Sequence, residues 1–291
     1  MVQKSWIGFC LLYLFSSWTL LAQDRDVANS MLENDPLNVK KAVLDNGFEV
    51  YLIEDEHAPM IFGAVAVKAG GKYDPKDATG MGHYLEHMLF KGTTTLGTTD
   101  YTKEKVYLDK IDALYEDLGK TTEPEKRKAI QKKINEEAVA AAEYAIPNEL
   151  DRLLASIGSK GVNAFTTAEM IVYHNSFPSN QVEKWLDIYA HRFQNPVFRL
   201  FQSELETVYE EKNRAMDDFT RPLFERFQKS LFKNHPYGQQ SVLGETDHLK
   251  NPSLMKMYAY FNKYYVANNM ALVLSGDFDA EEVMPVIKAK F

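Results

Sequence analysis

The sequence has little cysteine, no basic cluster and no long apolar run after its first two dozen residues. Cys10 is the one cysteine among 291 residues, which excludes a framework of disulfides within the chain. The formal net charge is −8 and the isoelectric point is about 5.5, so nucleic acid is not an expected partner. No segment beyond residue 22 is apolar enough to cross a membrane. The hydrophobic content of 45% suffices for one large core or two ordinary domains.

The first 22 residues have the pattern of a secretory signal peptide. Lys4 precedes an apolar stretch from residue 6 to residue 21, and Ala22 stands shortly before a charged segment. We therefore expect residues 1–22 to be removed and residues 23–38 to form a polar leader. The mature chain would then have no cysteine and no stable membrane span, and its expected location is periplasmic or secreted, at a bacterial cell envelope. An uncleaved N-terminal anchor is the alternative.

Two histidines and a glutamate occur together at residues 83–87, which read His-Tyr-Leu-Glu-His. Successive residues of an α-helix turn by about 100°, so His83, Glu86 and His87 share one face while apolar neighbours such as Leu85 occupy the other. Two neutral imidazoles one turn apart can hold a zinc ion, and a carboxylate beside them can take a proton from a zinc-bound water. We predict a helix that directs these three side chains into a cleft, with Thr79 as its N-cap.

Apolar alternation and turn residues predict a mixture of strands and helices along the rest of the chain. A β-hairpin is expected at residues 41–53 because Asp45-Asn46-Gly47 is a turn sequence between two apolar runs. Further strands are expected at residues 61–69, 162–165, 170–173 and 270–275, and further helices at residues 148–157, 182–193, 198–216 and 280–291.

Residues 101–147 differ from the rest of the chain in composition. They are dense in lysine and glutamate, poor in large apolar residues and nearly free of glycine. Two apolar stripes, separated by the segment from Gly119 to Pro124, predict an antiparallel pair of helices with a solvated outer face. A docking arm for a partner is the alternative to a plain structural extension.

A catalytic zinc site normally has three protein ligands and a water, so one ligand is still needed. The other histidines are isolated in the sequence, and a lone histidine is more often structural. The acidic helix offers four candidates, and spacing alone does not choose among Glu204, Glu206, Glu210 and Glu211. Glu204 and Glu211 share a face but lie about 10.5 Å apart along the axis. One of this pair would therefore bind the metal and the other would orient a neighbour, unless the helix is merely a solvated acidic surface.

Several segments in a fixed order carry a resemblance to a known family. Residues 83–87 have the H-x-x-E-H arrangement, inside the longer run from Gly80 to Thr93. The other segments are Leu44-Asp-Asn-Gly47, Asn163-Ala-Phe-Thr166, His235-Pro-Tyr-Gly238 and Leu272-Val-Leu-Ser-Gly276-Asp277. Together they extend from about residue 39 to residue 291 and resemble the pitrilysin/insulinase family of zinc endopeptidases.

The resemblance implies a fold and a third ligand. The implied fold is α+β, with a mostly antiparallel sheet and helices packed on one face, formed by residues 39–291 as a zinc peptidase catalytic domain. The helical segment at about 101–147 would be an insertion in it. The family's acidic motif, E-x-x-x-V-x-x-E, is matched from Glu204 through Val208 to Glu211. This match implies Glu211 as the third zinc ligand and Glu204 as a supporting carboxylate.

The resemblance also implies an activity, that of a zinc-dependent endopeptidase acting on peptides or small unfolded proteins. His83, His87 and Glu211 would hold one Zn²⁺ per chain, and Glu86 would act as the general base toward the zinc-bound water. The competing interpretations are a non-catalytic or partner-dependent peptide-binding scaffold subunit of the same fold, and a zinc hydrolase of non-peptide substrates on an unrelated fold.

A peptide substrate and a second domain are the expected partners. In the family the substrate adds as an extra strand to a sheet edge, and the matching edge here contains Asn163, Ala164 and Phe165. Two homologous domains of the family typically close around the peptide. We therefore expect a second homologous domain, either C-terminal to this chain or on another chain.

Overall fold

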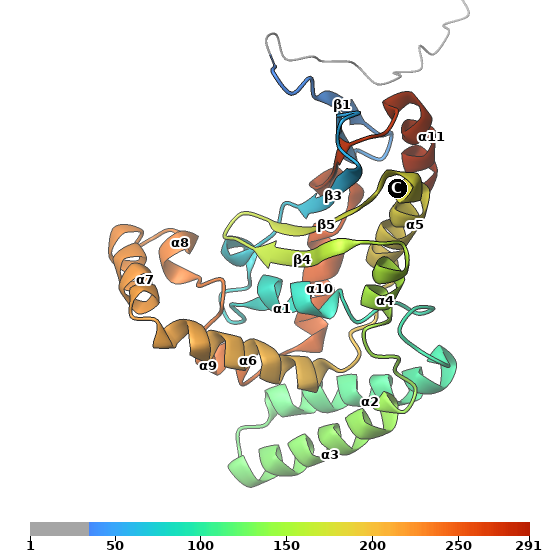
Figure 1. Ribbon diagram of the computed structural model, residues 1–291. Helices are drawn as coiled ribbons and strands as arrows, with labels where there is room; N and C mark the ends of the chain where they lie inside the picture. Colours follow the sequence, from blue (N-terminus) through green and yellow to red (C-terminus); the bar gives the residue numbers. More distant parts are fainter. Residues whose placement is uncertain (1–34) are drawn as a thin grey trace, which may run out of the picture.

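One sheet organises residues 35–291, which are the residues that a computed structural model describes (Figure 1). The predicted signal peptide and the predicted leader up to residue 34 lie outside the described residues. The sheet has six strands in the order β1-β2-β6-β3-β5-β4. The strands are β1 (Lys40–Val43), β2 (Glu49–Glu54), β3 (Met60–Val67), β4 (Lys160–Thr166), β5 (Ile171–Pro178) and β6 (Met270–Gly276).

Neighbouring strands run antiparallel with one exception, the parallel pair of β2 and β6. The expected N-terminal hairpin is present as β1 and β2, and β6 brings the C-terminal part of the chain between β2 and β3. The prediction of an α+β fold with a mostly antiparallel sheet is therefore confirmed.

Eleven helices accompany the sheet within residues 35–291. They are α1 (Met81–Met88), α2 (Tyr101–Lys120), α3 (Pro124–Ala142), α4 (Glu149–Ser156), α5 (Val182–Phe193), α6 (Phe201–Asp217), α7 (Thr220–Leu231), α8 (Pro236–Gln239), α9 (Thr246–Leu249), α10 (Leu254–Tyr264) and α11 (Ala280–Lys290). Helices α7 to α10 occupy a region for which the apolar pattern predicted no element. The acidic helix expected from residue 198 begins instead at Phe201, because Leu200 before it adopts a left-handed conformation with φ of 58°.

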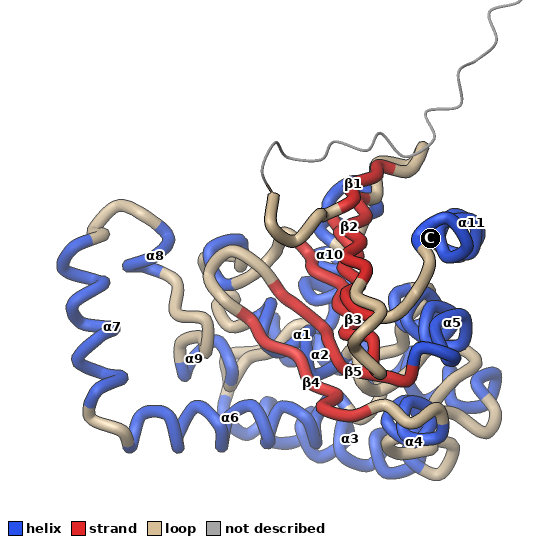
Figure 2. The backbone as a smooth tube through the Cα atoms, turned by 45° about the horizontal axis from the view of Figure 1, so that its top comes forward, coloured by secondary structure: helices blue, strands red, loops and turns tan. Residues whose placement is uncertain are grey.

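One face of the sheet is covered and the other is half open. On the covered face Ile61 and Tyr173 are fully buried, whereas Phe62 on the opposite face keeps 42% of its surface exposed. Helix α5 lies on the covered face, where the ring nitrogen of Trp185 donates a hydrogen bond of 2.9 Å to Asn175 on β5. Helices α1 and α10 contact the same face, and α11 packs along α5 (Figure 2). Helices therefore pack on one face of the sheet, as expected.

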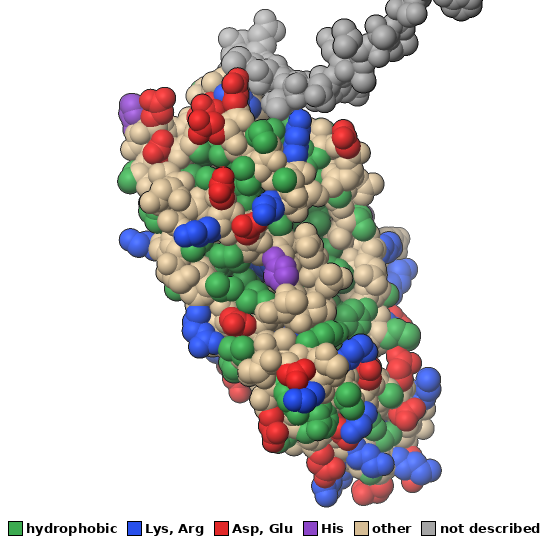
Figure 3. Space-filling view, turned by 90° about the vertical axis from the view of Figure 1, so that its right-hand side faces the viewer, with side chains coloured by type: hydrophobic (Ala, Val, Ile, Leu, Met, Phe, Trp, Pro, Cys, Tyr) green, Lys and Arg blue, Asp and Glu red, His purple; other side chains and the backbone are tan. Residues whose placement is uncertain are grey.

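Helices α2 and α3 form the antiparallel pair predicted within residues 101–147. Their apolar stripes meet each other and the domain, so that Ile111, Leu118, Ile134 and Ala141 are buried. The outer surface of the pair, at the bottom of Figure 3, is crowded with acidic and basic side chains. An antiparallel bridge between Thr98 and Ala145 closes its base against the domain. The pair is thus a charged extension held by a small apolar seam.

The N-terminus of α1 is held by a side chain that the sequence did not reveal. The expected cap at Thr79 is wrong, because the N-cap residue is Gly80 and no side chain of that residue can bind the helix. The Thr79 hydroxyl instead accepts a hydrogen bond from the backbone N–H of Glu245. Asp74 takes the capping role from outside the helix: its buried carboxyl accepts hydrogen bonds from the backbone N–H groups of Gly80 at 2.7 Å and Gly82 at 2.8 Å. This contact fixes where the helix starts.

We expect Asp74→Ala to lower the free energy of unfolding by about 2–4 kcal/mol, because two buried backbone donors lose their acceptor. Asp77→Ala is the matched control, since Asp77 makes an exposed ion pair with Lys256, and such pairs contribute at most about 1 kcal/mol. Urea unfolding of both variants measures the difference. Equal effects of the two substitutions would contradict the role assigned to Asp74.

Candidate metal centre

Helix α1 presents two histidines and a glutamate to a cleft because its apolar positions are buried. Leu85 and Met88 are fully buried in the core, so the opposite face of the helix is left to His83, Glu86 and His87. This is the arrangement that the 100° helical turn predicts. His83 and Glu86 are each only 7% exposed, which places both groups in a largely dry environment.

Three ligand atoms converge at this face. Nε2 of His83 lies 3.3 Å from Nε2 of His87, and Oε2 of Glu211 lies 3.6 Å and 3.4 Å from those two nitrogens. A tetrahedral zinc ion with bonds of about 2.0–2.1 Å holds its ligand atoms about 3.3 Å apart. Two imidazole nitrogens and a carboxylate oxygen are also a donor set that zinc accepts. The residues therefore fit a zinc ion in both spacing and chemistry.

Glu204 lies behind His87 rather than among the three ligand atoms. Its Oε1 is 2.9 Å from Nδ1 of His87, and its other oxygen pairs with the ammonium group of Lys91. A carboxylate at Nδ1 fixes the proton there, which leaves the lone pair of Nε2 for a metal ion. Nδ1 of His83 has no such partner within the described part of the chain. Glu206 and Glu210, the other carboxylates that spacing had left open, are exposed and do not reach the three atoms.

The two histidines have opposite pKa shifts. For His87, burial lowers the pKa, but hydrogen bonds to the Glu204 and Glu211 carboxylates outweigh burial and raise it to about 9. For His83, burial and the neighbouring His87 lower the pKa to about 4. In the neutral pH range of the metal-free site His87 is therefore the cationic histidine, and His83 is neutral.

Glu86 lies near the three ligand atoms, but it does not supply one of them. Burial raises the pKa of its carboxyl group, while the hydroxyl of Thr166 on β4 donates a hydrogen bond of 2.5 Å to Oε2 and acts in the opposite direction. A raised pKa brings a carboxylate closer to the range in which it exchanges protons at neutral pH. The arrangement can therefore accept a proton from a group held at the metal position.

The cleft in front of the helix has a volume of about 600 Å³ and is bordered by strand β4. Within residues 35–291, β4 is an edge strand with β5 as its one neighbour. Asn163, Ala164 and Phe165, the residues expected to bind substrate, all line the cleft. Side chains alternate along the strand, so Thr166 faces α1 while the Phe165 ring lies against His174 on the opposite face of the sheet.

Three residues of the cleft went unnoticed as site residues in the sequence. Lys91 pairs with Glu204, Thr166 binds Glu86, and Arg221 at the start of α7 lines the cleft. Lys91 lies four residues after His87, so helical spacing could have revealed it. Thr166 closes the Asn163-to-Thr166 segment that carried the resemblance, but no local pattern pairs it with Glu86.

The sequence pattern of the family described as Insulinase (Peptidase family M16) matches residues 49–107 and 139–244, which is more than half of the chain. The chain belongs to this family. The pattern of the Peptidase M16 inactive domain matches residues 253–291. The three ligand-bearing residues and Glu86 all lie within the first match, so the metal centre belongs to the part of the chain that is typical of this M16 family.

Proteins similar to this chain support the family assignment, and this chain covers about half of their length. An uncharacterized zinc protease of Rickettsia felis is 24% identical over 256 residues, which cover 87% of this chain and 49% of that protein. A protease from Helicobacter pylori has the same fold, with a TM-score of 0.66 and 21% identity over 87% of this chain and 50% of its own. The first half of the periplasmic protease PqqL from Escherichia coli has a TM-score of 0.64 and 18% identity over 87% of this M16 chain and 45% of its own. The chain spans about half the length of these proteins.

The family and fold of the chain exclude one of the hypotheses that the sequence alone left open. A zinc hydrolase on an unrelated fold is excluded, because the fold is that of M16 proteins. Among residues 35–291, no helix combines the length and the apolar character that crossing a membrane requires.

We expect Glu211→Gln to weaken zinc binding more than Glu204→Gln does. Loss of a carboxylate behind a ligand typically costs about 10- to 100-fold in affinity, whereas Glu211→Gln changes a ligand atom itself. Glu210→Gln is the matched control, because its side chain is on the same helix but exposed, and it should bind zinc as the unaltered chain does. Competition with a chromophoric chelator measures the three affinities. The reverse order for Glu204 and Glu211 would contradict the geometry.

We expect zinc affinity to rise about tenfold per pH unit between about pH 6 and pH 8. His87 with its pKa near 9 is protonated throughout this window in the metal-free chain, and binding at Nε2 must release that proton. His83, with a pKa near 4, is already neutral there and adds no slope. Calorimetry in buffers of different ionisation enthalpy should count about one proton released per zinc bound. A pH-independent affinity would contradict the assignment.

Proposed function

We propose that this chain is the catalytic half of a zinc-dependent endopeptidase that hydrolyses peptides or small unfolded proteins. The observation that carries the proposal is the convergence of His83, His87 and Glu211 at zinc spacing, with Glu86 beside them. Zinc proteases among the relatives support the same conclusion. One bound zinc would supply a Lewis acid and lower the pKa of its water toward about 7.

Glu86 is the general base of the proposed reaction. Its buried carboxylate lies on the helix turn between the two histidines, and Thr166 fixes one of its oxygens. The free oxygen can take a proton from the attacking water and return it to the leaving amine. His87 keeps the orientation that this chemistry needs because Glu204 holds its Nδ1.

Strand β4 would hold the substrate. Within residues 35–291 its outer edge has no neighbouring strand, and a peptide in extended form can pair with such an edge beside the cleft. Backbone pairing at Asn163, Ala164 and Phe165 does not select side chains. We therefore propose broad sequence tolerance, with selection for chains that can become extended.

A second M16 half would complete the enzyme, on the same polypeptide or on another chain. Members of the family pair two halves, and this chain spans about half the length of its relatives. Helix α7 supports the proposal because none of its residues is buried, and Leu223, Phe227 and Leu231 are more than half exposed. Such an apolar helix face next to the cleft is a surface that a second half would cover.

The setting and the helical pair belong to the same proposal. The N-terminal signal pattern supports a periplasmic or secreted enzyme, and so does the similarity to the periplasmic protease PqqL.

The family match stops at residue 107 and resumes at residue 139, which supports an insertion formed by α2 and α3.

We expect Glu86→Gln to retain zinc but to lower peptide hydrolysis by about 10²- to 10⁴-fold, because the base is lost while the ligands remain. Zinc content per chain and cleavage of an unfolded test protein such as casein are measured on the same preparation. Glu210→Gln serves as the control and should retain both properties.

Two results would contradict this role: loss of zinc in Glu86→Gln, or unchanged hydrolysis. A chain that binds zinc and peptide but cleaves nothing, even with its second half present, would favour the non-catalytic peptide-binding subunit instead.

A further inference from the structure

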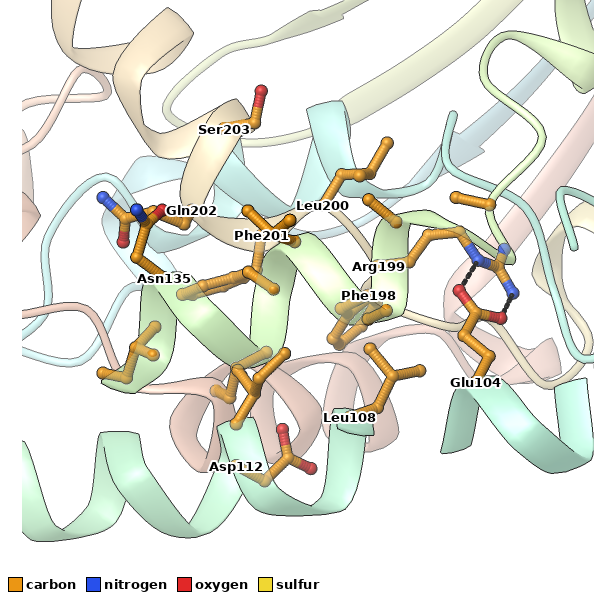
Figure 4. Close-up of a pocket in the computed structure, with 18 of the residues that line it drawn as sticks. Glu104, Leu108, Asp112, Asn135, Phe198, Arg199, Leu200, Phe201, Gln202 and Ser203 are labelled. Carbon is orange, nitrogen blue, oxygen red and sulfur yellow. Dashed lines mark hydrogen bonds and ion pairs between the residues drawn. The ribbon is translucent and has the colours of Figure 1, made fainter. Parts of the chain in front are cut away.

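A second pocket, partly open to solvent, lies away from the metal centre, between the helical pair and the start of α6 (Figure 4). Its volume is about 340 Å³, within the range of about 300–1,000 Å³ that small-molecule sites occupy. Its apolar lining comes from α2, α3, α10 and the segment before α6, and includes Leu108, Ile111, Ile134, Ala138, Phe198 and Tyr258. Much of that lining falls in residues 108–138, which the family match omits. The pocket is therefore a product of the helical pair.

The cations near this pocket are already neutralised. Arg199 forms a buried ion pair with Glu104, with Nε 2.8 Å from the carboxylate, and its other nitrogens donate to backbone carbonyls. Figure 4 shows this closed pair at one end of the pocket and the amides of Asn135 and Gln202 at the other. Oε1 of Gln202 accepts a hydrogen bond from Tyr115. No cationic side chain with an unpaired charge lines the pocket among the described residues.

Asp112 supplies an unpaired negative charge at the same pocket. It is half-buried and makes no hydrogen bond or ion pair within residues 35–291. Asp109 and Glu116 lie near it on α2, and so does Lys105, whose ammonium group pairs with Asp109. Burial, and then the charge of Asp109, raise the pKa of Asp112 to about 6. Glu206 adds a second carboxylate to the lining. A carboxylate in this position is stabilised by any cation that reaches it.

Two aromatic rings line the same pocket as Asp112. Phe198 and Tyr258 stack with their centroids 4.3 Å apart, and both line the pocket. Burial, and then the charge of Asp112, raise the pKa of Tyr258. Aromatic rings and a carboxylate that line one largely apolar pocket are the chemistry that recognises organic ammonium groups.

We propose that this pocket binds a small organic amine with an apolar body, its ammonium group at Asp112 and its body among Leu108, Ile134 and Phe198. The proposal does not depend on the peptidase function, because the pocket shares no residue with the cleft of the metal centre.

Three indole compounds of similar size test the proposal on the full chain: tryptamine, neutral 3-ethylindole and anionic indole-3-propionate. Calorimetry should show saturable binding of tryptamine, about tenfold weaker binding of 3-ethylindole, and weaker binding still of the acid. Asp112→Asn should remove the preference for the amine and leave 3-ethylindole unaffected. Asp117→Asn is the matched control on the same helix, because Asp117 is exposed and does not line the pocket, and it should behave as the unaltered chain.

A pocket-filling variant and a measurement with and without zinc complete the test. Ala138→Trp fills the pocket and should abolish binding of all three compounds; if that variant does not fold, the near-isosteric Asp112→Asn still decides. Tryptamine affinity should be the same with zinc and after chelation, which separates this site from the metal centre. Equal binding of the three compounds, no saturable binding of tryptamine, or binding that needs zinc would overturn the proposal. So would self-association of the chain that Ala138→Trp removes, since a second copy would then be the occupant.

Discussion

The contact between His87 on α1 and Glu204 on α6 is the interaction on which the rest of the metal centre depends. It joins residues 117 positions apart and fixes both the ring orientation and the tautomer of His87. Once α6 is held across α1 by this contact, its next two turns carry Glu211 to the two Nε2 atoms, because residues seven apart share a face of a helix. A second tie, from the hydroxyl of Tyr84 to the carbonyl oxygen of Phe201 at 2.5 Å, anchors the first turn of α6 to the buried side of α1.

The crossing of α1 and α6 is itself held by the buried pair of Arg199 and Glu104. Arg199, 2% exposed, binds the Glu104 carboxylate on α2 and the carbonyl oxygens of Lys91, Thr93 and Leu96, which follow α1. Every strong donor of the guanidinium group is thus used, which offsets the desolvation cost of burying a charge. Because Glu104 belongs to the base of the helical pair, the extension and the metal centre share a structural support. The buried counter-charge lies in the first turn of α2, which the family match includes, and not in residues 108–138, which it omits.

Sequence periodicity predicted one half of the site and could not predict the other. The face of α1 follows from the 100° turn alone, and so does the shared face of Glu204 and Glu211. Which of these two carboxylates meets the metal depends on the angle and height at which α6 crosses α1, and no local pattern holds that information; the family motif was needed to favour Glu211. The start of α1 was predicted wrongly at Thr79 because Asp74, which satisfies the helix, reaches it through a loop. Arg221 was missed for a similar reason, since it reaches the cleft only because the chain turns sharply between α6 and α7 (Figure 1).

The residues that would hold the metal are therefore well supported by packing within this chain, whereas the space for the proposed substrate is only partly covered. The ligand atoms lie between α1, which packs on β4 and β5, and α6, which packs against α1, and neighbouring side chains fix their positions. Helix α7 has no such support: its 12 residues include none that is buried, and a helix of this length is marginal in water without packing. It stands away from the sheet, at the far left of Figure 1, with its apolar face open. In the proposed enzyme, zinc affinity would thus be a property of this chain alone, whereas the second half would cover α7 and enclose the peptide.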